Sequence, residues 1–203
     1  PAEHEAAIAG VARRVDGLPL AVELAAAQTR LLTPAQILER LDRRLPVLSA
    51  GQRDAPARQR TQRAALDWSY ELLDGPAQHL FARLSVFAGG WTLAAAERVC
   101  GLIEGEAVDV FDGLTTLVES SLVRVRASDG AEPRYSMLQV TREYAADRLD
   151  ELPERDAIGR AHAEWVRDLV ETAEPELLLR DLRRWQEQLL AELVFQKSSD
   201  SIR

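Results

Sequence analysis

One change of hydrophobic period, between residues 122 and 138, constrains the fold of this chain more than any other feature. On both sides of it, apolar residues recur at helical spacing. Within Leu122–Arg126 and Arg134–Leu138, apolar and polar residues alternate, which predicts two strands joined by a loop. A two-stranded hairpin is barely stable alone, so this one must pack against the surrounding helices.

Helical periodicity predicts a mainly α protein. Thr33 and Thr92 are expected to be N-caps, and Pro34 stands at a first helical position. Several helices followed by one hairpin is the order of a winged helix, with the hairpin as its wing. The expected helices lie at about 2–15, 19–32, 34–45, 60–73, 77–87, 93–100, 106–120, 140–149, 154–174 and 176–193.

Composition excludes several classes of protein. The chain has 203 residues, which predicts one or two domains, and its apolar share of 46% is ordinary for a globular protein. No apolar run reaches the roughly 18 residues that span a bilayer. The single cysteine excludes a disulfide framework, and the three histidines lack the spacing of a catalytic zinc site. No catalytic constellation is present, so we expect no enzyme activity.

Four motifs carry a resemblance to a known family over about residues 1–150. The segment Gly17-Leu18-Pro19-Leu20-Ala21 resembles the GLPLA motif of NB-ARC proteins, the signal-transduction ATPases with numerous domains (STAND ATPases). The other three motifs resemble the winged-helix domain of that family in bacterial transcriptional regulators. They occupy residues 60–70, 83–92 and 137–145.

The resemblance implies a domain organisation. Residues 1–48 would be the GLPL helical domain, 49–59 a linker and 60–152 the winged-helix domain. Residues 153–203 would begin a helical-repeat, TPR-like sensor region. The chain starts at Pro1 without a methionine, so we expect it to be a piece of a longer, cytoplasmic protein in which an ATPase core precedes GLPL.

The same resemblance implies a nucleotide-dependent function. This segment would be the lid and switch that hold ADP in the off-state and rearrange on activation. Its partners would be the ATPase core of the same chain and, on activation, a second copy, but no membrane. ADP or ATP would bind the full-length parent, whereas no cofactor is expected for this segment alone. It contains no G-x-x-x-x-G-K-[ST] motif, and its one lysine, Lys197, lies outside any Gly-rich loop.

The nucleotide-contact candidates also have ordinary structural interpretations. Pro19, beside Leu18, stands where the family has a proline that packs against adenine. The alternative is that Pro19 is an ordinary proline at the first position of a helix. Leu138 stands where many relatives place the His of an MHD motif, which contacts the ADP β-phosphate. A leucine has no donor for phosphate, so the alternative is a core residue of the wing strand.

A cluster of arginines lies beside the expected linker. Arg58, Arg60 and Arg63, with Arg53, are candidates for contacting phosphate, either of a nucleotide (Arg60) or of a nucleic acid. The alternative is a solvated helix face. The four tryptophans, Cys100 and His162 are expected to be packing residues rather than ligands.

A winged-helix DNA-binding module is the alternative function. A DNA reader needs a basic recognition helix, which in this order of elements is 106–120. That stretch carries Glu106, Asp109, Asp112 and Glu119 and no Lys or Arg. The wing arginines, Arg124, Arg126 and Arg134, are too few to reverse this sign, and the whole chain has a net charge of -8. The sequence therefore predicts no specific nucleic-acid binding.

Overall fold

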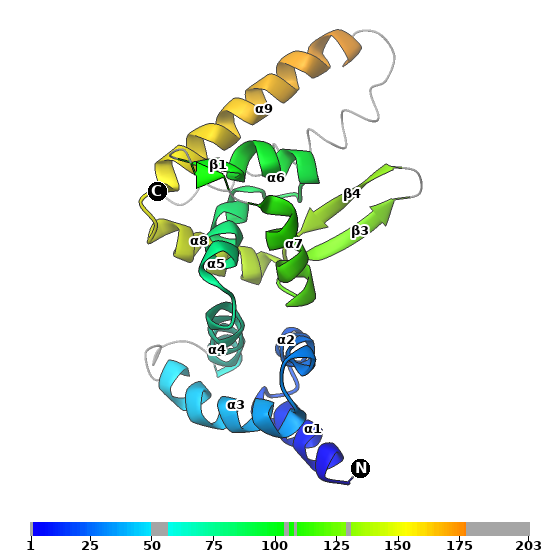
Figure 1. Cartoon of the computed structure of the whole chain (residues 1–203), viewed down its shortest axis with the longest axis vertical. Helices are drawn as coiled ribbons and strands as arrows, with labels where there is room; N and C mark the ends of the chain where they lie inside the picture. Colours follow the sequence, from blue (N-terminus) through cyan, green and yellow to red (C-terminus); the bar gives the residue numbers. More distant parts are fainter. Residues whose placement is uncertain (1, 50–56, 104–105, 108, 129–130, 178–203) are drawn as a thin grey trace. The chain divides into compact units, whose positions relative to one another are not determined.

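The computed structural model describes residues 2–49, 57–103, 106–107, 109–128 and 131–177 (Figure 1). Its internal contacts divide the chain into two compact units. Unit 1 comprises residues 1–75 and 116–122, and unit 2 comprises residues 76–115 and 123–203. The described part is mainly helical with a wing-like antiparallel hairpin, which confirms the expected fold class.

Unit 1 is a bundle of helices. Helix α1 packs on α3, and both α2 and α3 pack on α4. Its core is formed by buried aliphatic side chains such as Val15, Leu24 and Ile37. The helices are α1 (Ala2–Arg14), α2 (Pro19–Ala27), the short 3-10 helix η1 (Gln28–Arg30), α3 (Pro34–Ser49) and α4 (Ala57–Glu71).

The N-terminus of α3 is a reciprocal cap. The backbone amide of Gln36 donates to the Thr33 hydroxyl at 3.3 Å, and the Thr33 amide donates to Oε1 of Gln36 at 2.9 Å. This capping box satisfies two amides that the helix itself cannot pair. The expected N-cap at Thr33 is confirmed. At α6 the Thr92 hydroxyl accepts from the Ala95 amide at 3.2 Å, which confirms the second cap.

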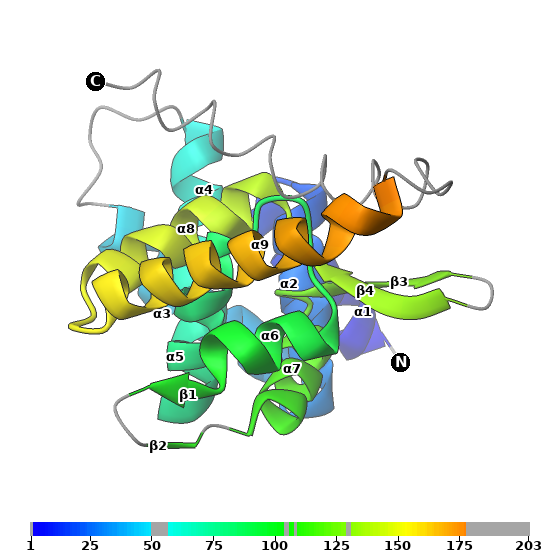
Figure 2. The ribbon, with the colours of Figure 1, turned by 90° about the horizontal axis from the view of Figure 1, so that it is seen from above.

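Unit 2 carries the elements of a winged helix (Figures 1 and 2). Phe81, Leu84 and Leu114 are fully buried in its core. The elements in chain order are α5 (Gly75–Arg83), η2 (Leu84–Val86), α6 (Leu93–Cys100), β1 (Leu102–Ile103), β2 (Glu106–Ala107), α7 (Val110–Glu119), β3 (Arg124–Ser128), β4 (Ala131–Ser136), α8 (Gln139–Asp150) and α9 (Arg155–Leu177). The residues of α7 from Thr116 onward belong to unit 1.

The wing is the antiparallel pair β3–β4. Arg126 stands opposite Arg134 and Val125 opposite Tyr135, and the register shifts after Arg126. The backbone of Tyr135 in β4 is also hydrogen-bonded to the backbone of Trp91. The Trp91 amide donates to the Tyr135 carbonyl at 2.8 Å, and the Tyr135 amide donates to the Trp91 carbonyl at 2.7 Å. This bridge anchors the hairpin on the core.

Helix α9 packs along α6 of the same unit. Ile158 is buried in a cluster with Ala82 and Leu149. Further along α9, His162 and Trp165 contact the ring of Phe87 edge-on. The centroid of the Phe87 ring lies 5.1 Å from that of His162 and 5.7 Å from that of Trp165. His162 is therefore a packing residue, as the sequence predicts.

Several sequence-based boundaries are wrong. The helix expected at 106–120 begins only at Val110, because Glu106–Ala107 pairs with Leu102–Ile103 as a second short hairpin. Helix α3 continues through Pro46 to Ser49, and α9 continues through Pro175 to Leu177. Each proline lies within the last turn of its helix, so it ends the helix a few residues later than expected.

The remaining boundary errors are smaller. The helix expected at 19–32 ends as α-helix at Ala27 and continues as η1. The wing strands lie at Arg124–Ser128 and Ala131–Ser136, which shifts both from the expected ranges. The expected helix at 176–193 and most of the expected linker at 49–59 lie outside the described residues. The expected domain boundaries stay a prediction.

Candidate functional site

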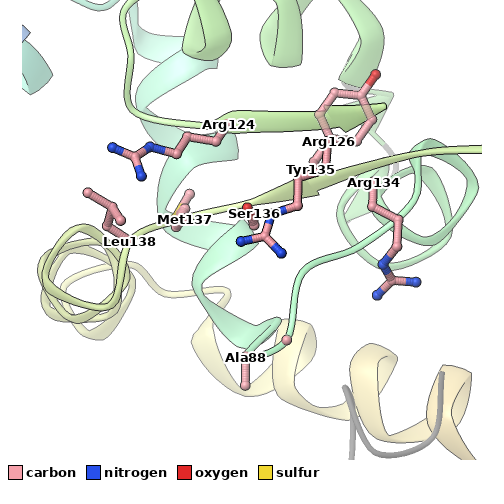
Figure 3. A pocket seen from close by; sticks show the side chains of 9 residues that line it. Ala88, Arg124, Arg126, Arg134, Tyr135, Ser136, Met137 and Leu138 are labelled. Atoms are coloured by element: carbon pink, nitrogen blue, oxygen red, sulfur yellow. The ribbon is translucent and has the colours of Figure 1, made fainter. Parts of the chain in front are cut away.

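A basic pocket on one face of the wing is the candidate site. It has a volume of about 450 Å³, and Arg124, Arg126 and Arg134 line it from the two strands (Figure 3). The loop residues Ala88 and Gly89 form another side. Ser136, Met137 and Leu138, at the end of β4, complete the lining together with Tyr135.

The strand register explains why the arginines gather. Residues two apart on a strand share a face, so Arg124 and Arg126 point to the same side of β3. Arg134 stands directly opposite Arg126, and Ser136 directly opposite Arg124. Figure 3 shows the Tyr135 ring projecting to the other side of β4 from Arg134. The polar face and the Val125–Tyr135 face of the hairpin are therefore distinct.

Each arginine has a different environment. Arg124 and Arg126 are exposed, whereas Arg134 is half-buried. Nη2 of Arg134 donates to the carbonyl of Gly90 at 3.1 Å, which ties this guanidinium to the loop before α6. Glu132, the acidic residue two positions before Arg134, is exposed and does not line the pocket. The lining side chains therefore bring positive charge and no carboxylate.

The outer face of α7 carries less negative charge than the sequence predicts. Glu106 lies in β2, outside the helix. Asp109 precedes the helix and accepts the Asp112 amide at 3.0 Å, as an N-cap does. Glu119 pairs with Nη1 of Arg30 at 2.9 Å. Asp112 lies on the exposed face, beside Phe111 and Thr115.

Phe111 is unusual because a large apolar side chain is 58% exposed in the middle of this face. The helical pattern over 106–120 predicts an inward face of Val108, Phe111, Leu114, Leu117 and Val118. Leu114 and Leu117 are buried as predicted, together with Val110, whereas Phe111 is exposed. The true phase of α7 turns Phe111, Asp112 and Thr115 outward.

The GLPL candidates lie on a tight turn of unit 1. Asp16 and Gly17 have positive φ angles of 54° and 60°, and the Gly17 amide donates to the Ala12 carbonyl at 2.9 Å. Leu18 is 5% exposed and packs inward, while Pro19 is exposed at the first position of α2. Pro19 is thus a helix N1 proline with an exposed ring.

The other candidates do not come together in one described site. Leu138 is the half-buried N-cap residue of α8, which corrects the interpretation of Leu138 as a wing-strand residue. Arg60 and Arg63 are half-buried in α4. The side chain of Arg58 and all of Arg53 lie outside the described residues. The basic pocket therefore contains Leu138 alone among the predicted site residues.

Sequence reasoning named the wing arginines but discounted them. The signal that finds the pocket is the cross-strand register, which brings Arg126 and Arg134 together, and the approach of the Ala88–Gly90 loop. Neither follows from periodicity. Among the residues that the structure describes, no cluster of metal-binding side chains is present, and no helix combines the length and apolar character needed to cross a membrane.

Comparison with known proteins identifies the fold of unit 2. Residues 73–150 match the model of a winged helix-turn-helix domain. The chain is 42% identical over 160 residues to a candidate HTH-type transcriptional regulator of Mycobacterium tuberculosis, covering 78% of this chain and 18% of that protein. It is 36% identical over 163 residues to an uncharacterized protein of the same species, covering 77% of this chain and 40% of that protein.

The chain thus spans about a fifth of the length of the first of these relatives and less than half of the second. No solved structure matches it. Neither similarity concerns a nucleotide, so the NB-ARC part of the resemblance stays a prediction. The chain contains a winged helix-turn-helix domain and is similar to bacterial proteins named as candidate HTH-type transcriptional regulators.

Proposed function

We propose that this chain is the winged-helix part of a bacterial transcriptional regulator, and that its wing contacts the DNA backbone. The observation that carries the proposal is the gathering of Arg124, Arg126 and Arg134 on one face of the wing. The matched domain and the names of the relatives support it. It adds a backbone contact to our expectation of no specific nucleic-acid binding, because contacts to phosphate carry no sequence information.

The electrostatics favour backbone contact over base readout. Arg guanidinium groups bind phosphate with two parallel hydrogen bonds and stay charged at any physiological pH. Contacts to phosphate fix the position of a protein on DNA but carry no sequence information. Each contact releases condensed counterions, so binding weakens as salt rises. Three wing arginines would give measurable but modest affinity.

Helix α7 adds little to base recognition. Its described exposed face offers Phe111 for apolar contact and the hydroxyls of Thr115 and Thr116, but no Lys or Arg. The Thr115 hydroxyl already donates to the Phe111 carbonyl at 2.9 Å, so toward a base it can only accept. Asp112 would repel nearby phosphates. The bidentate arginine or asparagine contacts that discriminate bases most strongly are absent from this described face. We therefore infer that the segment binds DNA without strong sequence preference.

Fluorescence anisotropy with a random duplex pool tests the proposal. Binding by the 203-residue chain should fall with salt, with a log–log slope of about −3 for three phosphate contacts. The variant Arg124→Gln should reduce the slope by about one. Arg160→Gln, which removes the same charge from the exposed face of α9, is the matched control and should leave the slope unchanged. A slope near zero, or an equal loss in both variants, would contradict the proposal.

A second candidate function is a nucleotide-controlled lid and switch. The GLPL turn favours it, because Pro19 presents an exposed ring at the start of α2 while Leu18 anchors the turn in the core. In this proposal ADP holds the off-state through the ATPase core of the longer protein, and activation permits self-association. Calorimetry of the longer chain with ADP, comparing Pro19→Ala with the unaltered protein, tests it. Unchanged ADP affinity would argue against a contact by Pro19.

A further inference from the structure

We propose that His162 and Trp165 of α9 are positioning residues for the wing, because their packing on Phe87 holds the loop to which the wing is attached. The inference rests on the proposed function and deepens it. Helix α9 lies outside the matched winged helix-turn-helix domain, yet its packing would control how firmly the wing is held for contact with DNA. The contacts run from α9 to Phe87, from Phe87 to Trp91, and from Trp91 to Tyr135 in β4.

The first observation is a continuous set of ring contacts between α9 and the loop that precedes α6. Phe87 contacts the rings of His162 and Trp165 edge-on, at interplanar angles of 87° and 78°. The centroids of the Phe87 and Trp91 rings are 5.6 Å apart, and each of these two side chains is only 1% exposed. Edge-to-face contacts depend on geometry, and close-packed interiors transmit strain. A shift of α9 is therefore transmitted to Phe87 and Trp91.

The second observation concerns the indole of Trp91. Its Nε1 is buried and has no hydrogen-bond acceptor in the part of the chain that the structure describes. A buried indole N–H usually finds an acceptor, which then helps to fix the ring. Among the described residues, the orientation of this indole depends instead on packing, to which Phe87 contributes an aromatic ring.

The third observation is that the wing is attached at this loop. Trp91 exchanges two backbone hydrogen bonds with Tyr135. The preceding residue, Gly90, accepts a hydrogen bond from the Arg134 guanidinium. A two-stranded hairpin is barely stable alone, so its bonds to the core determine how firmly the wing is held. The loop begins directly after Phe87, and both attachments therefore depend on the position of that ring.

Amide hydrogen exchange of the 203-residue chain measures the attachment directly, because the Trp91 and Tyr135 amides are the two donors of the bridge. Trp165→Ala should accelerate their exchange about tenfold relative to the amides of α7, since it removes an edge-on ring pair and its buried area. Trp165→Phe keeps an aromatic ring at this position and should restore most of the protection. His162→Ala, which removes the second edge-on ring, should act in the same direction as Trp165→Ala.

Ile158→Val is the matched control. Ile158 is buried on α9 in a cluster with Ala82 and Leu149 that does not include Phe87. Shortening it weakens the packing of the same helix without removing a ring contact. The exchange of the bridge amides relative to those of α7 should therefore stay as it is in the unaltered chain.

A double variant tests whether Phe87 carries the effect. In a Phe87→Leu background, Trp165→Ala should add little to the exchange of the bridge amides, because the ring that Trp165 contacts is already gone. Exchange that Trp165→Ala and His162→Ala both leave unchanged would overturn the inference. So would an effect of Trp165→Ala that is as large in Phe87→Leu as in the unaltered chain, or one that Ile158→Val reproduces.

Binding to a random duplex pool separates the inference from the proposed function. A wing that is already held loses less freedom on binding, so Trp165→Ala should lower DNA affinity about two- to tenfold. The wing arginines remain, so the salt slope should not change. If Trp165→Ala loosens the bridge but the unaltered chain does not bind DNA, the positioning role stands and the proposed function fails. If both chains bind DNA equally well, the proposed function stands and the inference is overturned.

Discussion

Nη2 of Arg83 lies 3.1 Å from Oε1 of Glu154, and each of the two side chains is only 8% exposed. Arg83 ends α5, and Glu154 immediately precedes α9. Nη1 of Arg83 also donates to the carbonyl of Cys100 at 3.2 Å, at the end of α6. One buried guanidinium therefore connects three helices of unit 2, and the wing and its pocket belong to that same unit.

Removing one partner of this ion pair should destabilise the protein strongly. Arg83→Met leaves the Glu154 carboxylate buried without its counter-charge, which costs about 3–5 kcal/mol. The double variant Arg83→Met with Glu154→Leu should recover much of this loss, because two apolar side chains need no compensation. Urea denaturation of the variants measures the coupling. Losses that simply add would show that the two residues are not energetically coupled.

The stability of unit 2 should depend on pH through Glu154. Burial by itself would raise the pKa of this carboxyl, but hydrogen bonds from its own backbone amide and from Arg83, and the charges of Arg83 and His79, lower the pKa overall. Nδ1 of His79 lies 3.8 Å from Oε1 of Glu154. A lowered folded-state pKa means that the contribution is present above the unfolded value of about 4.3 and is lost as pH falls through the folded-state value.

Denaturation between pH 7 and pH 3 measures this dependence. The stability difference between the unaltered chain and Glu154→Gln should be constant above about pH 5 and should shrink at lower pH. Asp156→Asn, two residues away and exposed in the first turn of α9, controls for general charge effects. A difference that grows as pH falls would contradict the direction of the pKa shift.

The sequence predicts the helices and the wing because both depend on local periodicity. Thr33 and Thr92 were identifiable as caps, since their capping partners lie within three residues. The bridge between Trp91 and Tyr135 was not, because it joins positions that are distant in the chain. The basic pocket depends on that bridge and on the register of the wing. The number of charged residues in each sequence segment therefore could not reveal the basic pocket.

The same reasoning explains the error at α7. Val108, Phe111 and Leu114 fit a helical stripe, so the pattern extended the helix back to Glu106. The short β1–β2 pair instead takes Glu106 and Ala107. The predicted inward residues Leu114 and Leu117 are buried, but Val110 is buried beside them in place of Phe111. Periodicity alone did not distinguish these two neighbouring positions.

Gly90 should be required for the attachment of the wing. Its φ angle is +92°, and a Cβ there would lie 2.5 Å from the Tyr135 carbonyl oxygen, which accepts the Trp91 amide. Gly90→Ala should therefore cost about 1–3 kcal/mol of stability for the backbone conformation alone. It should also weaken DNA binding, since Arg134 donates to the Gly90 carbonyl.

Gly159→Ala is the matched control for that variant. Gly159 lies inside α9, and nothing lies within 4 Å of where its Cβ would be. Alanine should stabilise the helix there by about 0.5–1 kcal/mol. Thermal unfolding of the two variants should move in opposite directions. Equal stability of Gly90→Ala and the unaltered chain would mean that the wing does not depend on this bridge.

The 203-residue chain should bind ADP weakly or not at all. A phosphate cradle for a nucleotide needs consecutive backbone amides and a lysine, and the sequence contains neither a Walker-type motif nor a lysine in a Gly-rich loop. Calorimetry with ADP provides the measurement. A micromolar ADP affinity that Arg126→Gln leaves unchanged would contradict the prediction and reveal a nucleotide site away from the wing.

The DNA bound by this chain should show no enriched sequence. Because the exposed face of α7 holds Phe111, Asp112 and Thr115, a phosphate near Asp112 would be repelled, and no side chain of this face donates a bidentate bond to guanine. Selection from a random duplex pool at about 150 mM salt should return a pool without a consensus. Asp112→Asn should strengthen binding at low salt, and Asp156→Asn on α9 should not. A recovered consensus that depends on Phe111 or Thr115 would instead show that α7 reads bases in the major groove.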